Sequence, residues 1–156
     1  MEGTVNPSTR QSPVVGVIQA RMSSSRLPGK VMLQVCGKPM LQHQIERIRR
    51  CTRIDTLVVA TSDHSEDQPI EDLCRTLDVA VFRGSLDDVL DRMVRAARPH
   101  APGWMVRLTG DCPLADPQVI DGVIGAGIGA DADYCSNALT PSFPDGLDAE
   151  DRKSVV

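Results

Sequence analysis

The chain has 156 residues, a length that corresponds to one domain. Hydrophobic residues make up 41% and charged residues 24%, which excludes a mostly disordered chain, a collagen-like chain and a disulfide-stapled miniprotein. The net charge of −4 and an aromatic content of 3% argue against a nucleic-acid partner, because such proteins use a basic surface and aromatic side chains that stack on bases.

The cysteines and the apolar runs indicate where the protein works. The five cysteines are widely spaced and contain no C-x-x-C pair, which is typical of free thiols in a reducing compartment. No run approaches about 18 apolar residues, so the sequence predicts no membrane partner. Residues 1–12 are polar and lack the apolar core of a signal peptide, and we interpret them as a disordered leader. We therefore expect a cytoplasmic protein.

Hydrophobic patterning predicts alternating strands and helices from residue 14 onward. Short apolar runs predict strands at Val14–Ala20, Leu57–Thr61, Val79–Phe82, Trp104–Leu108 and Asp133–Ser136. Helical spacing of apolar residues predicts helices at Pro39–Arg50, Pro69–Leu77, Ser85–Ala97 and Pro117–Ile124. This order predicts an α/β fold, a three-layer Rossmann-like sandwich with a mainly parallel sheet. In such folds the ligand lies beyond the carboxyl ends of the strands.

The loop after the first predicted strand combines cations with small side chains. These residues are Arg21, Ser23, Ser24, Ser25, Arg26 and Lys30. Small residues let backbone N–H groups approach an anion, so the loop favours a polyphosphate ligand, with an exposed flexible loop as the alternative. Lys30 is followed by Val31 rather than by Ser or Thr, which disfavours a P-loop NTPase.

A carboxylate follows the fourth predicted strand, in the segment RLTGDCPLADP. Asp111 comes just past the strand end, where it could hold Mg²⁺ against phosphate oxygens. Asp116 precedes Pro117 and is interpreted as the cap of the next helix. Cys112 is adjacent to Asp111, but a neighbouring carboxylate raises the pKa of a thiol, so we do not interpret this cysteine as a nucleophile.

Two further segments carry candidate site residues. The segment FRGSLDDVLDR supplies the turn after the third strand and the start of a helix, with Arg83, Gly84, Ser85 and Asp88. Carboxylates at a helix start are also favoured by the helix dipole, so these acids have a structural alternative. The segment FPDGLDAE contains Asp145 and Asp148, which either belong to a turn or line a site.

Five segments in one order resemble the cytidylyltransferase family of bacterial surface-sugar biosynthesis. The nearest likeness is to spore-coat polysaccharide cytidylyltransferase-like proteins, with the CMP-sialic-acid and CMP-Kdo synthetases as relatives. The segments are IQARMSSSRLPGK, VVATS, FRGSLDDVLDR, VRLTGDCPL with its following DP, and PDGLDAE. The resemblance implies a nucleotide-diphosphosugar-transferase fold and transfer of CMP from CTP to a sugar, a keto-sugar acid or a sugar phosphate, with release of pyrophosphate.

The resemblance also implies roles for individual residues. Arg21, Arg26 and Lys30 would grip the triphosphate, and Asp111 would bind Mg²⁺. Residues 83–88 would approach the base, helped by backbone groups near Gln19 and Ala20. The residues expected to be catalytic are Arg21, Lys30 and Asp111, and the expected sugar side holds Asp145 and Asp148. The family often has Gly where Ser23 stands, so the backbone there is less free to approach phosphate.

The sequence departs from the family after PDGLD. Family members continue with segments that complete the metal and sugar sites, and they commonly dimerise through that region, whereas DRKSVV does not resemble them. We therefore expect an incomplete nucleotidyltransferase domain over residues 13–150 and a non-family tail over residues 151–156. A homodimer is a possible assembly. A catalytically impaired nucleotide-binding remnant or subunit, and a related transferase that uses another nucleotide such as UTP, are the alternatives.

Overall fold

The structure is a computed structural model that describes residues 12–140 and 143–153. Six strands form the main sheet: β1 (Val14–Gln19), β4 (Thr56–Ser62), β5 (Ala80–Gly84), β6 (Trp104–Thr109), β7 (Tyr134–Ser136) and β8 (Glu150–Lys153). A separate hairpin is formed by β2 (Gln34–Val35) and β3 (Lys38–Pro39). The helices are α1 (Met40–Ile48), α2 (Gln68–Thr76), α3 (Val89–Ala97) and α4 (Pro117–Gly129), with short 3₁₀ turns at η1 (Lys30–Met32), η2 (Ser65–Asp67) and η3 (Arg98–His100).

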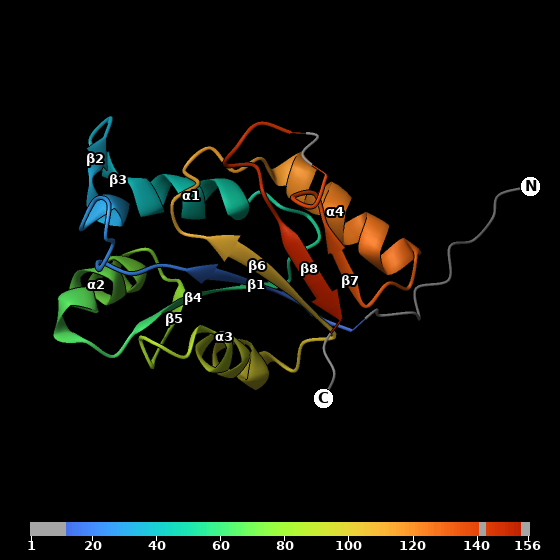
Figure 1. Ribbon diagram of the computed structural model, residues 1–156, viewed down its shortest axis with the longest axis horizontal. Helices are drawn as coiled ribbons and strands as arrows, with labels where there is room; N and C mark the ends of the chain where they lie inside the picture. Colours follow the sequence, from blue (N-terminus) through green and yellow to red (C-terminus); the bar gives the residue numbers. More distant parts are fainter. Residues whose placement is uncertain (1–11, 141–142, 154–156) are drawn as a thin grey trace, which may run out of the picture.

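The strand order across the main sheet is β5-β4-β1-β6-β8-β7. The strands β1, β4, β5 and β6 are parallel to one another, whereas β8 is antiparallel to both of its neighbours, β6 and β7. A mainly parallel sheet with helices on both faces (Figure 1) confirms the predicted three-layer α/β fold. The continuous apolar sequence of β1 explains its central place, because an inner parallel strand is covered on both faces.

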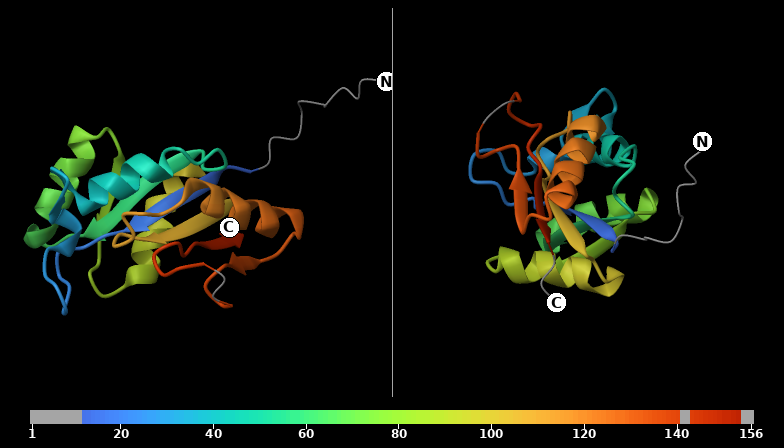
Figure 2. Two further views of the ribbon diagram at one scale, coloured as in Figure 1. Left: turned by 90° about the horizontal axis from the view of Figure 1, so that it is seen from above. Right: turned by 90° about the vertical axis from the view of Figure 1, so that its right-hand side faces the viewer.

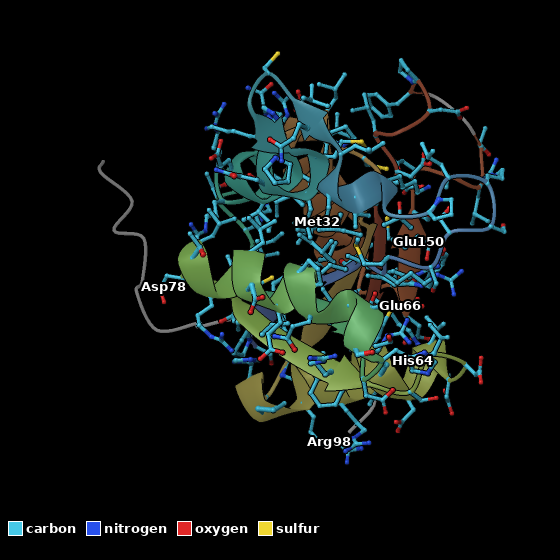
Figure 3. All side chains as sticks on the ribbon, turned by 90° about the vertical axis from the view of Figure 1, so that its left-hand side faces the viewer. Met32, His64, Glu66, Asp78, Arg98 and Glu150 are labelled. Carbon is cyan, nitrogen blue, oxygen red and sulfur yellow. The ribbon has the colours of Figure 1, made fainter. Side chains whose placement is uncertain are left out.

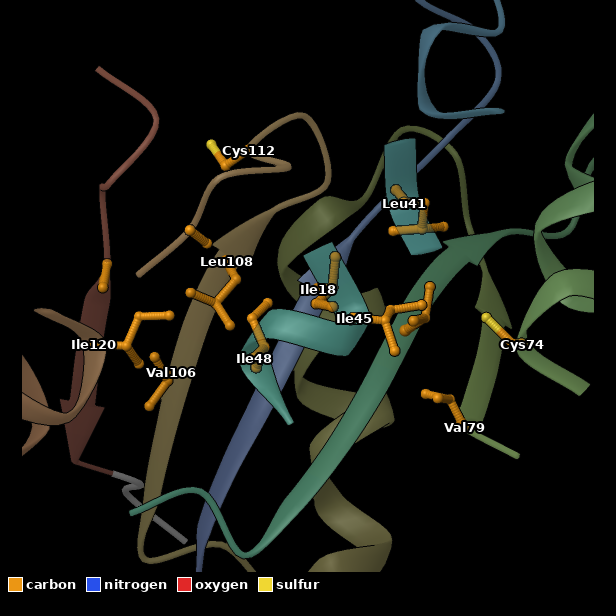
Figure 4. Close-up of a cluster of buried hydrophobic side chains, with 14 of the residues drawn as sticks. Ile18, Leu41, Ile45, Ile48, Cys74, Val79, Val106, Leu108, Cys112 and Ile120 are labelled. Carbon is orange, nitrogen blue, oxygen red and sulfur yellow. The ribbon is translucent and has the colours of Figure 1, made fainter. Parts of the chain in front are cut away.

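The helices divide between the two faces of the sheet (Figure 2). On one face, Ile18 of β1 packs in a core with Leu41 of α1 and Ile120 of α4, and α2 contributes to the same cluster. Figure 4 shows this cluster. On the other face, Val17 of β1 packs with Met93 of α3. The carboxyl ends of the four parallel strands therefore meet at one edge of the sheet, where the sequence predicted the ligand.

Each predicted strand and helix is present, but the third predicted helix starts later than expected. The prediction began at Ser85, whereas α3 begins at Val89. Asp88 caps this helix, and its carboxylate accepts a hydrogen bond from the Asp91 N–H at 2.9 Å. The Ser85 hydroxyl oxygen instead accepts from the Asp88 N–H at 3.1 Å. The serine therefore forms a turn in front of the helix, and the cap lies one turn further along the chain.

Two parts of the sheet structure were not predicted from the sequence: the hairpin β2–β3 and strand β8. The sequence of β8 is EDRK, which lacks apolar alternation, and the strand pairs between β6 and β7. The domain boundary predicted at residue 150 therefore falls within a strand. Residues 1–11 and 154–156, which hold most of the predicted leader and the end of the predicted tail, lie outside the described residues. Within the described ranges, no helix is long and apolar enough to cross a membrane.

Candidate functional site

A cavity of about 260 Å³ lies at the carboxyl ends of β1 and β6. It is lined by Gln19, Arg21, Ser24, Ser25, Arg26, Lys30, Val31, Arg107, Thr109, Gly110 and Asp111. Figure 3 looks at this end of the molecule, where Met32, His64 and Glu150 come from three separate segments. Four of the lining residues are cationic and one is a carboxylate, so the cavity attracts anions.

The loop that carries most of these cations, residues 21–30, is closed by a backbone hydrogen bond. The Gly29 N–H donates to the Met22 carbonyl oxygen at 2.8 Å. Gly29 has a φ of 71°, a left-handed conformation that glycine adopts without steric cost. Arg21 is adjacent to one partner of this bond and Lys30 to the other, so the closure fixes the backbone from which both cations extend.

Lys30 and Asp111 form an ion pair although they lie 81 residues apart in the chain. The Lys30 Nζ is 2.6 Å from the Asp111 Oδ2, and the two side chains remain 25% and 40% exposed. The ammonium holds the pKa of Asp111 below its ordinary value, so the carboxylate is ionised at neutral pH. The pair joins the loop after β1 to the loop after β6, and both partners remain accessible to a ligand.

Gly110 places Asp111 at the cavity, and the sequence did not single it out. Its N–H donates to the Gln19 carbonyl oxygen at 2.8 Å, which draws the end of β6 against the end of β1. A Cβ at position 110 would lie 2.7 Å from that oxygen and 2.9 Å from the Ala20 Cβ. The close approach requires glycine, and a glycine directly after an apolar strand was the available signal.

Gln19 is the last residue of β1 and Ala20 directly follows it, and the two residues contribute in different ways. Gln19 lines the cavity, and its Oε1 is buried without a hydrogen-bond partner among the described residues. The Ala20 N–H donates to the Ala60 carbonyl oxygen at 3.1 Å, and the Ala20 side chain is buried in the core. Gln19 therefore offers an acceptor to a ligand, while Ala20 fixes the origin of the loop.

The structure brings most of the predicted loop residues to the cavity. Arg21, Ser24 and Arg26 line it together with Lys30. Ser23 is half-buried and is not one of the lining residues. The cationic side chains and the two serines, Ser24 and Ser25, therefore face the same space, as expected for an anion site.

Arg83 was expected to contact a ligand, but its guanidinium is engaged within the protein. It donates to the carbonyl oxygens of Ser62 and His64 and to the side chains of Gln68 and Glu71, at 2.6–3.0 Å. The bond to Glu71 holds the pKa of that carboxyl below its ordinary value. Arg83 does not line the cavity, and it fastens the loop after β4 to the helix α2.

The turn after β5 rests on Arg92, whose side chain is fully buried. The Arg92 Nη1 donates to the carbonyl oxygens of Ser85 and Leu86, while Nε and Nη2 have no partner within the described ranges. A Cβ at Gly84 would lie 2.9 Å from the Phe82 ring and 3.3 Å from the Arg92 Cγ. Gly84 and Ser85 therefore shape the backbone of this turn, and Arg92, which the sequence analysis did not select, supports it.

Arg107 was also missed, although it lines the cavity. Its Nη1 lies 2.8 Å from the Glu150 Oε2, and the two residues are paired in register across β6 and β8. The available signal was a single arginine in the otherwise mostly apolar strand WMVRLT. Because β8 was not predicted, this ion pair could not be predicted either.

The remaining acidic candidates divide into a helix cap and an exposed turn. The Asp116 Oδ1 accepts from two N–H groups in the first turn of α4, at 2.8 and 3.3 Å, which confirms the predicted cap. Asp145 and Asp148 are both exposed. Burial raises the pKa of the Cys112 thiol, and the carboxylates of Asp111 and Asp148 add to that shift, which agrees with a cysteine that is not a nucleophile.

Asp111 is the carboxylate among the lining residues, and it decides which metal chemistry the site can support. Within residues 12–140 and 143–153, no group of three or more His, Cys, Asp or Glu side chains gathers into a metal site. Mg²⁺ commonly uses one or two carboxylates, phosphate oxygens and water. The donor set therefore fits Mg²⁺ that is bound together with a phosphate ligand, rather than a metal centre built by the protein alone.

A mainly parallel α/β sheet, with a cationic loop after its first strand and a carboxylate after a neighbouring strand, is typical of α/β domains that bind nucleotides. The family model for cytidylyltransferases matches residues 15–144. The chain therefore belongs to the cytidylyltransferase family, which is a family of nucleotidyltransferases, and the resemblance found in the sequence is confirmed.

The chain is similar to relatives and solved structures of that family. The spore coat polysaccharide biosynthesis protein SpsF of Bacillus subtilis is 39% identical over 125 residues, which cover 78% of this chain and 52% of SpsF. A cytidylyltransferase structure from Leptospira borgpetersenii has a TM-score of 0.87 at 32% identity. The match covers 92% of this chain and 61% of the Leptospira chain. A CMP:2-keto-3-deoxy-manno-octonic acid synthetase complexed with CTP has a TM-score of 0.68 at 29% identity. This match covers 79% of this chain and 51% of the synthetase chain. The chain spans about half the length of the curated relatives it matches.

Proposed function

We propose that this protein binds CTP with Mg²⁺ at the cavity beyond β1 and β6, and that it transfers CMP to a sugar with release of pyrophosphate. The observation that carries the proposal is the combination of four cations and one carboxylate in a single cavity. A triphosphate with a divalent cation is the ligand that such a set of charges accommodates. The similarity to a synthetase complexed with CTP supports cytidine as the nucleoside.

The basic loop supplies the contacts to the triphosphate in this proposal. Arg21 and Arg26 offer planar guanidinium groups that bind phosphate oxygens in pairs, and Lys30 offers a compact charge. Ser24 brings a small side chain to the same space, while Ser23 acts through its backbone. Because phosphate oxygens carry the charge that builds up on the leaving pyrophosphate, these cations stabilise the transition state as well as the bound nucleotide.

Lys30 and Asp111 change partners when the nucleotide binds. In the free protein each neutralises the other at 2.6 Å. A triphosphate competes for the ammonium, which leaves the Asp111 carboxylate available to Mg²⁺. When bound, Mg²⁺ would be held by Asp111 and phosphate oxygens, and it would neutralise negative charge on the phosphates. The pair therefore neutralises these two charges until the ligand arrives.

In this proposal the base and the acceptor are assigned to different segments of the chain. We place the base against the end of β1, at Gln19 and Ala20, and against the turn at 84–85; Arg83 and Asp88 act there by holding backbone in place. We place the sugar near Asp145 and Asp148, on the side where Asp148 influences Cys112. The acceptor oxygen attacks the α-phosphorus of CTP, the bond to pyrophosphate breaks, and no covalent enzyme intermediate is needed.

The proposal extends to the setting of the reaction. Five free cysteines suit a reducing compartment, so we place the protein in the cytoplasm. By analogy with the family pattern, we propose a homodimer as its assembly, and cell-surface polysaccharide biosynthesis as the process that uses its product. SpsF, a spore coat polysaccharide biosynthesis protein, supports that process.

Nucleotide binding and pyrophosphate release test the proposal separately. In thermal-shift titrations with Mg²⁺, we expect CTP to stabilise the chain more than UTP, GTP or ATP. Lys30→Ala should abolish most of the CTP shift, whereas Lys38→Ala, which removes the same charge from an ion pair with Glu46, should preserve it. Pyrophosphate release from CTP with a panel of keto-sugar acids and sugar phosphates then measures transfer. Binding without release would favour a nucleotide-binding module, and a preference for UTP would favour another nucleotidyltransferase.

A further inference from the structure

Asp67 connects the cationic loop to the body of the sheet. Its side chain is 1% exposed, and its Oδ1 accepts a hydrogen bond from the Met22 N–H at 2.6 Å. Its Oδ2 accepts from the N–H of Ser62 at 3.0 Å and from the hydroxyl of the same serine. One carboxylate therefore holds the second residue of the loop after β1, which lies 45 positions before Asp67, against the last residue of β4.

The position of Asp67 in the sequence suggests a different role from the one observed. Asp67 occupies the N-cap position of α2, where an aspartate ordinarily accepts hydrogen bonds from the first N–H groups of its own helix. No such bond is made. The carboxylate turns instead toward the loop and β4, so the helix forgoes a cap that is worth about 1 kcal/mol.

Burial of this charge is compensated by the hydrogen bonds that it accepts. Burial by itself would raise the pKa of Asp67, but the hydrogen bonds from Ser62 and Met22 leave its pKa below the ordinary value. The group is therefore a carboxylate at neutral pH. Hydrogen bonds to an ionised acceptor are shorter and roughly twice as strong as neutral ones, which makes Asp67 a firm anchor for a backbone N–H.

Met22 extends that anchor to both ends of the loop. Its N–H is held by Asp67, and its carbonyl oxygen accepts the Gly29 N–H that closes the loop. Arg21 directly precedes Met22, and Lys30 directly follows Gly29. The chain of contacts therefore runs from β4 through Asp67 and Met22 to the backbone of both cations.

From this chain of contacts we propose that Asp67 is a positioning residue for triphosphate binding, which acts through Met22 to hold Arg21 and Lys30 in their binding geometry. The inference rests on the proposed function, because it assigns to Asp67 a share of the affinity for the phosphates. Asp67 does not line the cavity in which we propose that the triphosphate binds. The contribution of Asp67 to ligand affinity should therefore increase with the number of phosphates on the ligand, and it should be absent for a ligand without phosphates.

Asp67→Asn tests the anchor with little change of volume. The amide oxygen of asparagine can still accept a hydrogen bond from the Met22 N–H. The amide nitrogen, however, would then face the Ser62 N–H, and because both groups are donors, the two hydrogen bonds to Met22 and Ser62 cannot both be kept. We expect affinity for CTP and for inorganic pyrophosphate, each with Mg²⁺, to fall about tenfold or more, as for loss of a hydrogen bond to a charged group. Affinity for cytidine should change by less than about twofold. Asp63→Asn is the matched control, because Asp63 is exposed on the same segment and carries the same charge.

Coupling to Arg21 separates positioning from general damage to the fold. If Asp67 acts through the loop, Asp67→Asn should weaken CTP binding by a smaller factor in the Arg21→Ala background than in the wild type, because only Lys30 is then left for it to position. Additive losses, an equal loss of cytidine affinity, or unchanged CTP affinity in Asp67→Asn would each overturn the inference.

Amide hydrogen exchange at Met22 provides a test that does not depend on the ligand. In the wild-type protein the Met22 N–H should exchange more slowly than that of Ser23, and Asp67→Asn should accelerate it. Equal exchange rates at Met22 and Ser23 in the wild type would contradict the proposed role of Asp67 as an anchor. This comparison uses only the wild-type protein, so it holds even if the variant fails to fold. A wild-type protein with a protected Met22 that does not bind CTP would instead contradict the proposed function.

Discussion

Asp151 of β8 should make this protein less stable as the pH rises toward neutrality. Its side chain is 0% exposed, and neither carboxylate oxygen has a hydrogen-bond partner within the described part of the chain. The strand register places Asp151 between Val106 of β6 and Cys135 of β7, and a Cβ on Gly127 of α4 would lie 3.0 Å from its Oδ2. Burial raises the pKa of this carboxyl to about 7, against the smaller lowering effect of the Arg152 N–H.

The sign and size of the effect follow from proton linkage. Because the pKa of Asp151 is about 7 in the folded state and 3.8 for the ordinary group, the folded state binds more protons between these values. Stability therefore decreases as the pH rises through this window, and the loss is complete above about pH 7. A difference of about three pH units corresponds to about 4 kcal/mol. That is a large fraction of the roughly 5–15 kcal/mol that stabilises an ordinary domain.

Urea unfolding at pH 5, 6, 7 and 8 measures this effect when the wild type is compared with Asp151→Val. Valine favours a strand and places apolar atoms beside Cys135, its register partner in β7, so this variant should be more stable at pH 8 by up to about 4 kcal/mol. The difference should shrink toward pH 5, where Asp151 becomes neutral. Asp87→Asn, which removes an exposed charge, should follow the wild type. Parallel stability curves for Asp151→Val and the wild type would refute the reasoning and would mean that this carboxyl is not buried in the sheet.

Three further variants address the cavity. Arg21→Ala should weaken CTP binding by about 1.5–3 kcal/mol in a calorimetric titration, the range for a hydrogen bond to a charged group, and unchanged affinity would remove this arginine from the phosphate site. Asp111→Asn should leave the thermal midpoint nearly unchanged but remove most of the Mg²⁺ dependence of CTP binding; an unfolded variant would show that Asp111 is a structural residue. Gly110→Ala should cost about 1–3 kcal/mol in urea unfolding, because its Cβ would lie 2.7 Å from the Gln19 carbonyl oxygen, and full stability would contradict the close approach of the two strands.

The sequence by itself determined the layers of this protein and the edge at which its site lies. Apolar runs with β-branched residues predicted β1, and helical spacing predicted α1 and α4, because these signals depend on neighbours along the chain. The cap at Asp116 was predictable for the same reason, since its partners are two and three residues away. The carboxyl ends of parallel strands meet at one edge, so the position of Arg21 and Asp111 near a common site followed from topology.

Only the tertiary structure decided which of these groups meet and which are already engaged. The contacts between Lys30 and Asp111 and between Met22 and Asp67 join segments 81 and 45 residues apart, and no local pattern encodes such distances. Strand β8 could not be predicted from the sequence because EDRK has no apolar alternation. Its place in the sheet is set by pairing with β6 and β7. Arg83 has the chemistry of a phosphate ligand, yet four hydrogen bonds inside the fold occupy it. Residue type fixes what a side chain can bind, but the partners within reach depend on how distant segments pack.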